Sequence, residues 1–542
     1  MRWPFLLIVA AAHAAESGYT DPSVCRGCHR QIFESYQSTG MGKSFSKAEA
    51  IPPLARFSHP ASERSYSVTG RPDGYYLRRW QAGETNILEK RIDYVIGSGN
   101  HSKTFLHRDP RGRLMELPIS WYSEAGGYWA MSPGYDRPDH SDFRREVTDA
   151  CLFCHNGYPS QVNGGLAMGI DCQRCHGPGE AHSKGRGEIV NPAKLNLERQ
   201  LEVCMQCHLE SASRTLPDAI RRFARGPFSY RPGDPLGDFM IYFDFVKPAS
   251  DDRITVNNSA YGLLRSKCYL QSEGRLRCTT CHNPHGGRVN YVAACRNCHQ
   301  SSHEPATGDC ANCHMQKRRT EDAVHVVMTD HFIRRQPLMG RLLAPLQERH
   351  DRVSGPVKLL YPRRVPDSAL YLAMANQDAP DLLKAIAGAQ PKHAEPYFAL
   401  GEASRKSGLT GQAIRAYRQA IALDPADARS FTAISSLLLE RGDFDAAIAL
   451  LEPAVKRMPE QVSLLNSLAV LYGRKQRFDD ALQLLSKAVQ YDPDEPLSWL
   501  NLGVSLEAKG DRKGAEAAYR QALLLQPDLG RAAEYLRWIS KN

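Results

Sequence analysis

The chain has 542 residues, which is too many for one hydrophobic core, so we expect two or more domains. Its formal net charge is +10, but the lysines and arginines are scattered and form no basic run. This pattern argues against a nucleic-acid partner.

The first fourteen residues are typical of a secretory signal peptide. Arg2 supplies a positive start, Phe5 to Ala12 form an apolar stretch, and Ala12-His13-Ala14 is a small-residue cleavage site. The alternative is a short buried helix. No later stretch reaches the ~18 apolar residues that span a bilayer. We therefore expect an exported protein without a transmembrane segment, periplasmic or extracellular.

A short sequence signature, Cys-x-x-Cys-His, occurs seven times and uses fourteen of the 15 cysteines. Its copies are Cys25-Cys28-His29, Cys151-Cys154-His155, Cys172-Cys175-His176, Cys204-Cys207-His208, Cys278-Cys281-His282, Cys295-Cys298-His299 and Cys310-Cys313-His314. This is the attachment signature of c-type haem, in which two thioether bonds and one axial imidazole hold the cofactor. On a helical turn, residues i, i+3 and i+4 share one face, as this attachment requires.

Two other uses of such cysteines fit the pattern less well. Zinc sites pair Cys-x-x-Cys units without requiring a histidine after each one. A redox dithiol would occur once, within a βαβ pattern. Seven covalent haems c therefore explain the spacing best, and we expect a heptahaem cytochrome domain over residues 15–335. Short gaps between signatures bring neighbouring haems close together, and haem replaces much of the regular structure there.

Between the first two signatures, residues 56–135 predict a small antiparallel β-insert. Ser65–Val68 and Tyr75–Leu77 flank the turn sequence Arg71-Pro72-Asp73-Gly74, which indicates a hairpin. The aromatic residues of this stretch are interpreted as its core rather than as a substrate site; they are Tyr75, Tyr94, Trp121, Tyr128 and Trp129.

Each haem iron keeps a sixth position, for which histidines outside the signatures are candidates. The distal candidates are His59, His101, His182, His285, His303, His325 and His331, with His107 and His140 as further possibilities. A histidine close to its own signature cannot easily reach the opposite face of the same haem, so we expect it to bind a neighbouring one. The pattern leaves open whether one iron stays five-coordinate and catalytic.

The remaining cysteine, Cys268, has no cysteine left to pair with. We interpret it as a small buried apolar residue, and a reactive thiol is the alternative.

A 34-residue period follows from Ala394, marked by Pro425, Pro459, Pro493 and Pro527. It resembles the tetratricopeptide repeat and predicts an α-solenoid over 366–542. Its parts are repeats at 394–427, 428–461, 462–495 and 496–529, a degraded unit at 366–392 and a capping helix to 542. Such solenoids commonly bind a protein or peptide. Residues 336–365 are interpreted as a linker, and the fold class is mainly α.

The order of motifs resembles the multihaem cytochromes related to the tetrahaem cytochrome c-554, within the hydroxylamine oxidoreductase and pentahaem nitrite reductase group. The matching stretches are Val24–His29 with Ser38–Met41, Ile170–Gly179, Cys278–His285, Cys310–Met315 and Thr329–Arg335. The resemblance implies electron transfer, with His182, His285 and His331 as distal ligands. All seven signatures end in histidine, whereas the nitrite reductases carry a catalytic Cys-x-x-Cys-Lys haem. Hydroxylamine oxidoreductase differs by its eighth haem and a tyrosine link.

Three functions remain in view. The first is an electron-transfer protein whose repeats dock a protein partner. The second is an oxidoreductase acting on a small nitrogen or sulfur compound at a five-coordinate haem. The third is a structural subunit in which the repeats are the essential module. We favour electron transfer between redox partner proteins, and whether the chain is an enzyme stays open.

Overall fold

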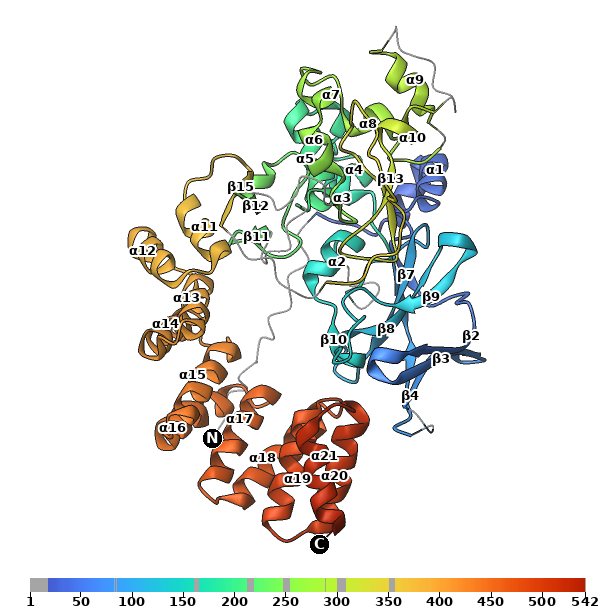
Figure 1. The fold of residues 1–542 in the computed structure, drawn as a ribbon. Helices are drawn as coiled ribbons and strands as arrows, with labels where there is room; N and C mark the ends of the chain where they lie inside the picture. The colour runs from blue at the N-terminus through green and yellow to red at the C-terminus, as the bar shows by residue number, and fades with distance from the viewer. Residues whose placement is uncertain are drawn as a thin grey trace.

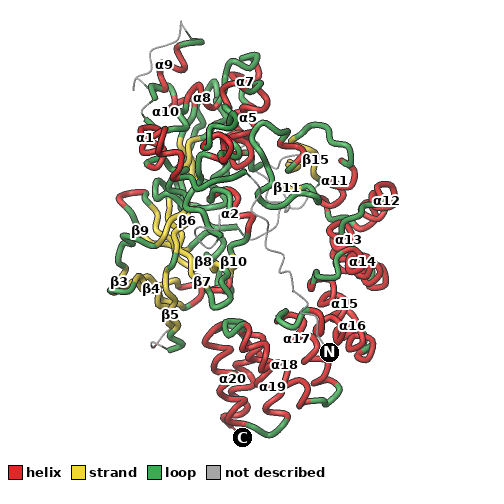
Figure 2. Tube along the Cα trace, turned by 180° about the vertical axis from the view of Figure 1, so that it is seen from behind, coloured by secondary structure: helices red, strands yellow, loops and turns green. Residues whose placement is uncertain are grey.

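The computed structural model describes residues 18–81, 83, 85–159, 165–211, 219–246, 254–287, 289–299, 309–349 and 356–541. The predicted signal peptide and His303 lie outside these residues. In chain order, a helix leads into a β-rich region, then into short helices that carry most signatures, and finally into a helical solenoid (Figure 1). Figure 2 shows the same division from behind, with strands gathered in the first region and helices in the last.

The β-rich region contains two antiparallel sheets. The first runs in the order β1-β6-β7-β8-β10, with β9 also paired to β8, and the second in the order β2-β3-β4-β5. Their strands are β1 (Phe45–Lys47), β2 (Leu54–His59), β3 (Arg64–Arg71), β4 (Gly74–Gln81), β5 (Leu88–Ile92), β6 (Tyr94–Ile96), β7 (Ser102–Arg108), β8 (Leu114–Tyr122), β9 (Tyr128–Met131) and β10 (Arg145–Glu146). This region therefore begins before residue 56 and ends after residue 135.

The predicted hairpin is confirmed. Strands β3 and β4 pair in register from Arg64 with Gln81 to Arg71 with Gly74, so Pro72 and Asp73 alone form the turn. The five aromatic residues named above are partly buried and pack against hydrophobic clusters of this region. They belong to the packing of the sheets, as expected.

The signature-bearing region consists of short helices tied by two small sheets. The helices are α1 (Ser23–Gln37), α2 (Asp149–His155), α3 (Gln173–His176), α4 (Glu180–Ser183), α5 (Leu197–His208), α6 (Ser259–Arg265), α7 (Lys267–Leu270), α8 (Cys278–Cys281), α9 (Tyr291–Arg296) and α10 (Ala311–His314). The sheets are β11 (Ala219–Arg221), β12 (Met240–Phe245) and β15 (Val357–Tyr361), and β13 (Lys317–Arg319) with β14 (Val327–Thr329).

Strand β15 lies within residues 336–365, for which the sequence predicts a linker. It pairs antiparallel to β12, and Val357 is buried in a cluster with Phe243 and Tyr371. The prolines of this segment indicate a spacer, but its apolar residues after Pro356 close a sheet instead. The solenoid is thus anchored to the signature region through β15 rather than tethered by a free chain.

The solenoid is a row of antiparallel helix pairs. They are α11 (Ser368–Asn376), α12 (Ala379–Ala389), α13 (Ala394–Lys406), α14 (Thr410–Leu423), α15 (Ala428–Glu440), α16 (Phe444–Arg457), α17 (Val462–Arg474), α18 (Phe478–Tyr491), α19 (Pro496–Ala508) and α20 (Arg512–Leu525), followed by α21 (Gly530–Lys541). A Cβ at Gly401 would lie 2.4 Å from the Tyr417 ring. This contact explains why a small residue recurs where the two helices of a repeat approach.

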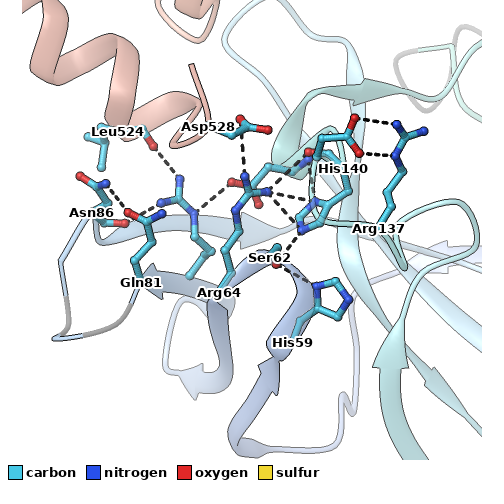
Figure 3. A network of polar contacts seen from close by, with 12 residues as sticks. His59, Ser62, Arg64, Gln81, Asn86, Arg137, His140, Leu524 and Asp528 are labelled. Atoms are coloured by element: carbon cyan, nitrogen blue, oxygen red, sulfur yellow. Dashed lines mark hydrogen bonds and ion pairs between the residues drawn. The ribbon is translucent and has the colours of Figure 1, made fainter. Parts of the chain in front are cut away.

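The far end of the solenoid returns to the β-rich region (Figure 1). Loops after α18 and α20 meet strands β3 to β5 and the β7–β8 turn through polar contacts that we term the clasp. Its contacts are Arg113–Asp492 at 2.7 Å, Arg111–Asp492 at 3.2 Å, Lys90–Asp494 at 2.6 Å, Arg64–Asp528 at 3.6 Å and Arg79 Nη2 to the Leu524 carbonyl at 2.5 Å. Figure 3 shows Arg64 reaching both Asp528 and His140.

The clasp predicts an effect of Asp492→Asn. The Asp492 side chain is only 4% exposed and accepts from Arg111 and Arg113. Losing its charge leaves both guanidiniums less well paired, and we expect the free energy of unfolding to fall by about 1–3 kcal/mol. Chemical denaturation would measure this loss, and small-angle scattering would show a larger radius of gyration if the clasp opens.

The matched control is Asp479→Asn in the same solenoid. Asp479 is 83% exposed in its ion pair with Lys509, so its loss should change stability by less than about 0.5 kcal/mol. Equal effects of the two substitutions would contradict a stabilising role for the clasp.

A buried carboxyl on β8 predicts a pH dependence. Burial raises the pKa of Glu116 to about 7, opposed by Arg145 and supported by Glu348. The folded state therefore holds this proton more tightly than the unfolded state, whose carboxyl titrates near its ordinary value. Stability from this group is present in acid and falls as pH rises from about 4.5 to about 7, by up to about 3 kcal/mol. Urea titrations would measure the free energy of unfolding of wild type and Glu116→Gln across this pH range. The difference between the two should change with pH by that amount, and a difference that stays constant with pH would contradict the prediction.

Candidate functional site

The signatures lie on helical turns, so each first cysteine and its histidine share a face. Backbone N–H groups of four signature histidines donate to the carbonyl of the first cysteine at 2.9–3.0 Å: His176, His282, His299 and His314. The other three signatures lie in α1, α2 and α5. In α1 the helix is kinked at His29, whose φ and ψ are −117° and 40°.

All 15 cysteines are among the described residues, and each is a free thiol rather than half of a disulfide. In four pairs, thiols of different signatures lie close enough for one to shift the pKa of the other: Cys25 with Cys172, Cys154 with Cys207, Cys204 with Cys278, and Cys295 with Cys310. Some signatures are therefore neighbours in space without being consecutive in sequence: the first lies beside the third, and the second beside the fourth.

Residues inside the signatures join three of them directly. Arg174 Nη2 donates to the Phe153 carbonyl at 2.8 Å, and Gln206 Nε2 donates to the Arg174 carbonyl at 3.1 Å. All three side chains are buried. Sequence reasoning missed these residues because haem attachment itself places no demand on the two positions between the cysteines. The large polar side chains of Arg174 and Gln206 between the cysteines were the feature of the sequence that could have indicated these links.

Three signature histidines face a second imidazole. His29 faces His182 with ring centroids 6.3 Å apart and planes 11° apart. His176 faces His285 at 6.0 Å and 9°, and His282 faces His331 at 6.1 Å and 29°. Two metal–nitrogen bonds of about 2 Å plus two half-rings require a separation of about 6 Å. These pairs therefore have the spacing that holds one iron between two imidazoles.

In each pair, the second histidine follows a different signature from the one whose histidine it faces. His182 follows the third signature but faces the first, and His285 follows the fifth but faces the third. These ring positions agree with the expectation that such histidines reach past their own signature.

Backbone carbonyls orient several of these rings. Nδ1 of His176 lies 2.8 Å from the Val190 carbonyl, and Nδ1 of His331 lies 3.0 Å from that of Thr329. Nδ1 of His314 lies 2.6 Å from the Arg334 carbonyl. A carbonyl at Nδ1 fixes the tautomer that leaves Nε2 free for a metal. Burial also lowers the pKa values of His282, His285 and His331, which favours the neutral ligand form.

The turn that carries His331 is held by an adjacent carboxylate. Asp330 is buried and accepts from Arg318 at 2.9 Å, from Arg334 at 3.4 Å and from the Phe332 N–H at 2.9 Å. These contacts hold the turn that places the His331 ring beside His282.

The structure does not bring every distal candidate to a signature. Both ring nitrogens of His59 have protein partners, Ser62 at 2.8 Å and Asp136 at 3.0 Å, on the far side of the β-rich region. We therefore do not propose His59 as a haem ligand. Its position on a strand that turns away from the signatures could not be read from local spacing.

The two further possibilities also contact residues of the β-rich region. His140 contacts Arg64 and Tyr66, and His107 Nδ1 lies 3.0 Å from the Arg91 carbonyl. Two distal candidates lie near the β13–β14 hairpin: the His325 ring lies 5.0 Å from that of Tyr122 at an angle of 49°, and His101 lies close enough to the Val327 backbone for it to affect the pKa of the imidazole. Within the described residues, no second imidazole is in ring contact with His101 or His325.

Two other signature histidines, His155 and His208, have lowered pKa values. Burial lowers the pKa of His155 and lowers that of His208 to about 4. Among residues that the structure describes, no second imidazole lies in ring contact with either. Cys268 is partly buried, and burial raises the pKa of its thiol, as expected for an unreactive residue.

In the described ranges, no group of three or more His, Cys, Asp or Glu side chains is placed to hold a bare metal ion. Nor do those ranges contain a helix with the length and apolar character needed to cross a bilayer.

Comparison with known proteins supports parts of this picture. Tetratricopeptide repeat family models match residues 394–427, 432–496 and 466–535, which confirms the predicted repeats. A stretch of 207 residues is 23% identical to a protein described as multiheme cytochrome MtrA from Shewanella baltica (strain OS185), covering 34% of this chain and 57% of that protein. The chain thus spans a little over half the length of that relative. The finer resemblance to the cytochrome c-554 group stays a prediction.

Solved structures that resemble part of the chain are tetratricopeptide repeat proteins and MamA proteins. A thermophilic tetratricopeptide repeat protein from Thermus thermophilus has a TM-score of 0.27 and 20% identity, over 32% of this chain and 96% of that one. MamA has a TM-score of 0.27 and 19% identity, over 31% and 98%. MamA from Desulfovibrio magneticus RS-1 has a TM-score of 0.25 and 22% identity, over 28% and 85%.

Proposed function

We propose that this chain is an exported multihaem c-type cytochrome that carries electrons between redox partner proteins through seven covalently bound haems. The observation that carries the proposal is the set of three imidazole pairs, 6.0–6.3 Å apart, each including a signature histidine. Such a gap suits an iron with two axial imidazoles. Bound haem would supply one-electron transfer at potentials set by its ligands, burial and nearby charge.

The residues present fit this cofactor. Fourteen free cysteines lie in pairs on helical turns, where two thioether bonds need them. The partner imidazoles come from loops distant in sequence, so each bound haem would also link two parts of the chain. The contacts between signatures make a continuous set of neighbours, as a path for electrons requires.

The other parts support the same assignment. Covalent haem attachment occurs outside the cytoplasm, and the expected signal peptide would take the chain there, to the periplasm or beyond. The tetratricopeptide repeats are a protein-interaction module, and we assign to them the docking of a protein partner. The weak similarity to a multihaem cytochrome agrees with the assignment.

The odd cysteine gives a direct test. Protein matured in a host that attaches c-type haem should be red, carry seven haems by pyridine haemochrome assay, and offer one alkylatable thiol, Cys268, under denaturing conditions. Colourless protein with fifteen reactive thiols would remove the proposal. Low-spin EPR signals from at least the three paired sites are the accompanying expectation.

A second candidate function is an oxidoreductase acting on a small nitrogen or sulfur compound. The observation that favours it is the partly buried His155 ring, with which no other described imidazole is in ring contact. Adding nitrite, hydroxylamine or tetrathionate while recording absorption and EPR spectra separates the two. A high-spin signal that shifts with one of these compounds supports the enzyme, and spectra that none of them moves support electron transfer alone.

A further inference from the structure

One buried cation lies where three signatures meet. Arg174 stands between the two cysteines of the third signature and is 1% exposed. Its guanidinium donates to the Phe153 carbonyl of the second signature at 2.8 Å, and its backbone carbonyl accepts from Gln206 of the fourth at 3.1 Å. The second cysteine of each of these signatures, Cys154, Cys175 and Cys207, is close enough to feel its charge.

The charge is permanent and only partly balanced. A guanidinium stays protonated in proteins, even when buried. Nε and Nη1 of Arg174 have no hydrogen-bond partner. Three rings cover the guanidinium instead, with its carbon 4.2 Å from the Phe153 centroid, 5.0 Å from Tyr158 and 5.5 Å from Phe228. Cation–π contacts of this kind stabilise a cation without neutralising it.

The structural links between these signatures do not require an arginine at residue 174. Gln206 ties the fourth signature to the third through the Arg174 backbone, so the neighbouring side chain is not needed for that link. A neutral donor could serve the Phe153 carbonyl. What a charged side chain supplies here, and a neutral donor does not, is a full positive charge in a site that water does not screen.

We propose that Arg174 raises the reduction potentials of the haems attached at the second, third and fourth signatures, by holding a permanent positive charge where these signatures meet. The inference rests on the proposed function. Adding an electron makes a haem more negative by one unit, so a nearby buried cation stabilises the reduced form of each of the three. The other four attachment sites keep the potentials set by their own surroundings.

The test is a redox titration of the full holoprotein with substitutions at this position. Arg174→Gln keeps an amide donor for Phe153 and removes the charge. Arg174→Lys keeps the charge when the titration is run at a pH low enough to hold a buried ammonium protonated. For Arg174→Gln we expect about a tenfold fall in the ratio of reduced to oxidised haem at a fixed applied potential, about 59 mV for a one-electron couple. The change should affect no more than three of the seven haems. Arg174→Lys should titrate close to wild type.

The matched control is Arg26→Gln, because Arg26 also stands between the cysteines of a signature. Its side chain is 55% exposed and pairs with Glu34, so water screens its charge and its loss should leave the titration nearly unchanged. A titration of Arg174→Gln that superimposes on wild type would overturn the proposal. So would equal shifts for Arg174→Gln and Arg174→Lys, since packing rather than charge would then be responsible.

If Arg174→Gln does not take up haem, a second variant tests the same proposal. Asp171 is buried beside Arg174, and Asp171→Asn removes a negative charge while keeping an oxygen for the Gln173 N–H. It should ease reduction of the haem at the third signature, which Asp171 and Arg174 both adjoin, and this shift is opposite to that of Arg174→Gln; no shift would overturn the proposal. Haem content is measured on every sample. Protein without haem contradicts the proposed function, whereas seven haems with unmoved potentials contradicts only the role of Arg174.

Discussion

Replacing His285 by alanine is expected to change one haem from low-spin to high-spin while leaving the other six as they were. The His285 ring lies 6.0 Å from that of His176, with planes only 9° apart, so on the proposed function it would complete the coordination of the haem iron held by His176. Without it, that iron loses a strong-field imidazole and takes water or nothing. EPR and the near-infrared absorption of the oxidised holoprotein would record the change.

Two further variants sharpen this result. His285→Met should restore a six-coordinate haem and raise its potential, because methionine is the weaker donor to oxidised iron. His59→Gln is the control, since both nitrogens of His59 are bound by Ser62 and Asp136. High-spin signal from His59→Gln, or none from His285→Ala, would reverse the assignment of these two histidines.

Replacing Asp142 by asparagine is expected to destabilise the β-rich region by about 3–5 kcal/mol, because it leaves a buried arginine without its counter-ion. Asp142 is 1% exposed, and its Oδ2 lies 3.0 Å from Nε of the fully buried Arg79. Arg64 is buried nearby, and its guanidinium lies 3.6 Å from the carboxylate of Asp528 in the solenoid. Burial raises the pKa of Asp142, and the two arginines oppose that shift.

Asparagine isolates the effect of charge. The φ of residue 142 is +53°, a conformation that asparagine adopts more readily than most residues, so the backbone need not change. Thermal unfolding followed by circular dichroism would measure the loss. Asp139→Asn, at a carboxylate that is 61% exposed, is the matched control and should cost less than about 0.5 kcal/mol. A loss at residue 142 no larger than at residue 139 would show that this buried ion pair contributes no stability.

The clasp changes how the solenoid should be studied. Removing residues 366–542 would also remove Asp492, Asp494 and Asp528, which pair with arginines and a lysine of the β-rich region. A truncated protein that lost haem or solubility would therefore say nothing about partner binding. Substitutions on solenoid surfaces that do not contact the clasp are the better test of docking.

Several features followed from the sequence because their physics is local. A haem signature needs its residues within one helical turn, and a repeat needs its small and large residues in fixed register, as with Gly401 against Tyr417. The β3–β4 hairpin needs only two strands and a turn. Strand β15 was missed because its partner, β12, lies more than a hundred residues earlier.

The amino-acid sequence alone thus determined the repeats and the hairpin and predicted the covalent attachment sites, since bonds between near neighbours depend on spacing along the chain. Only the tertiary structure decided which imidazole faces which, that His59 turns away, and that Arg174 lies among three signatures. These contacts join residues far apart in sequence. Their geometry depends on how whole loops and sheets pack, and no local pattern contains that information.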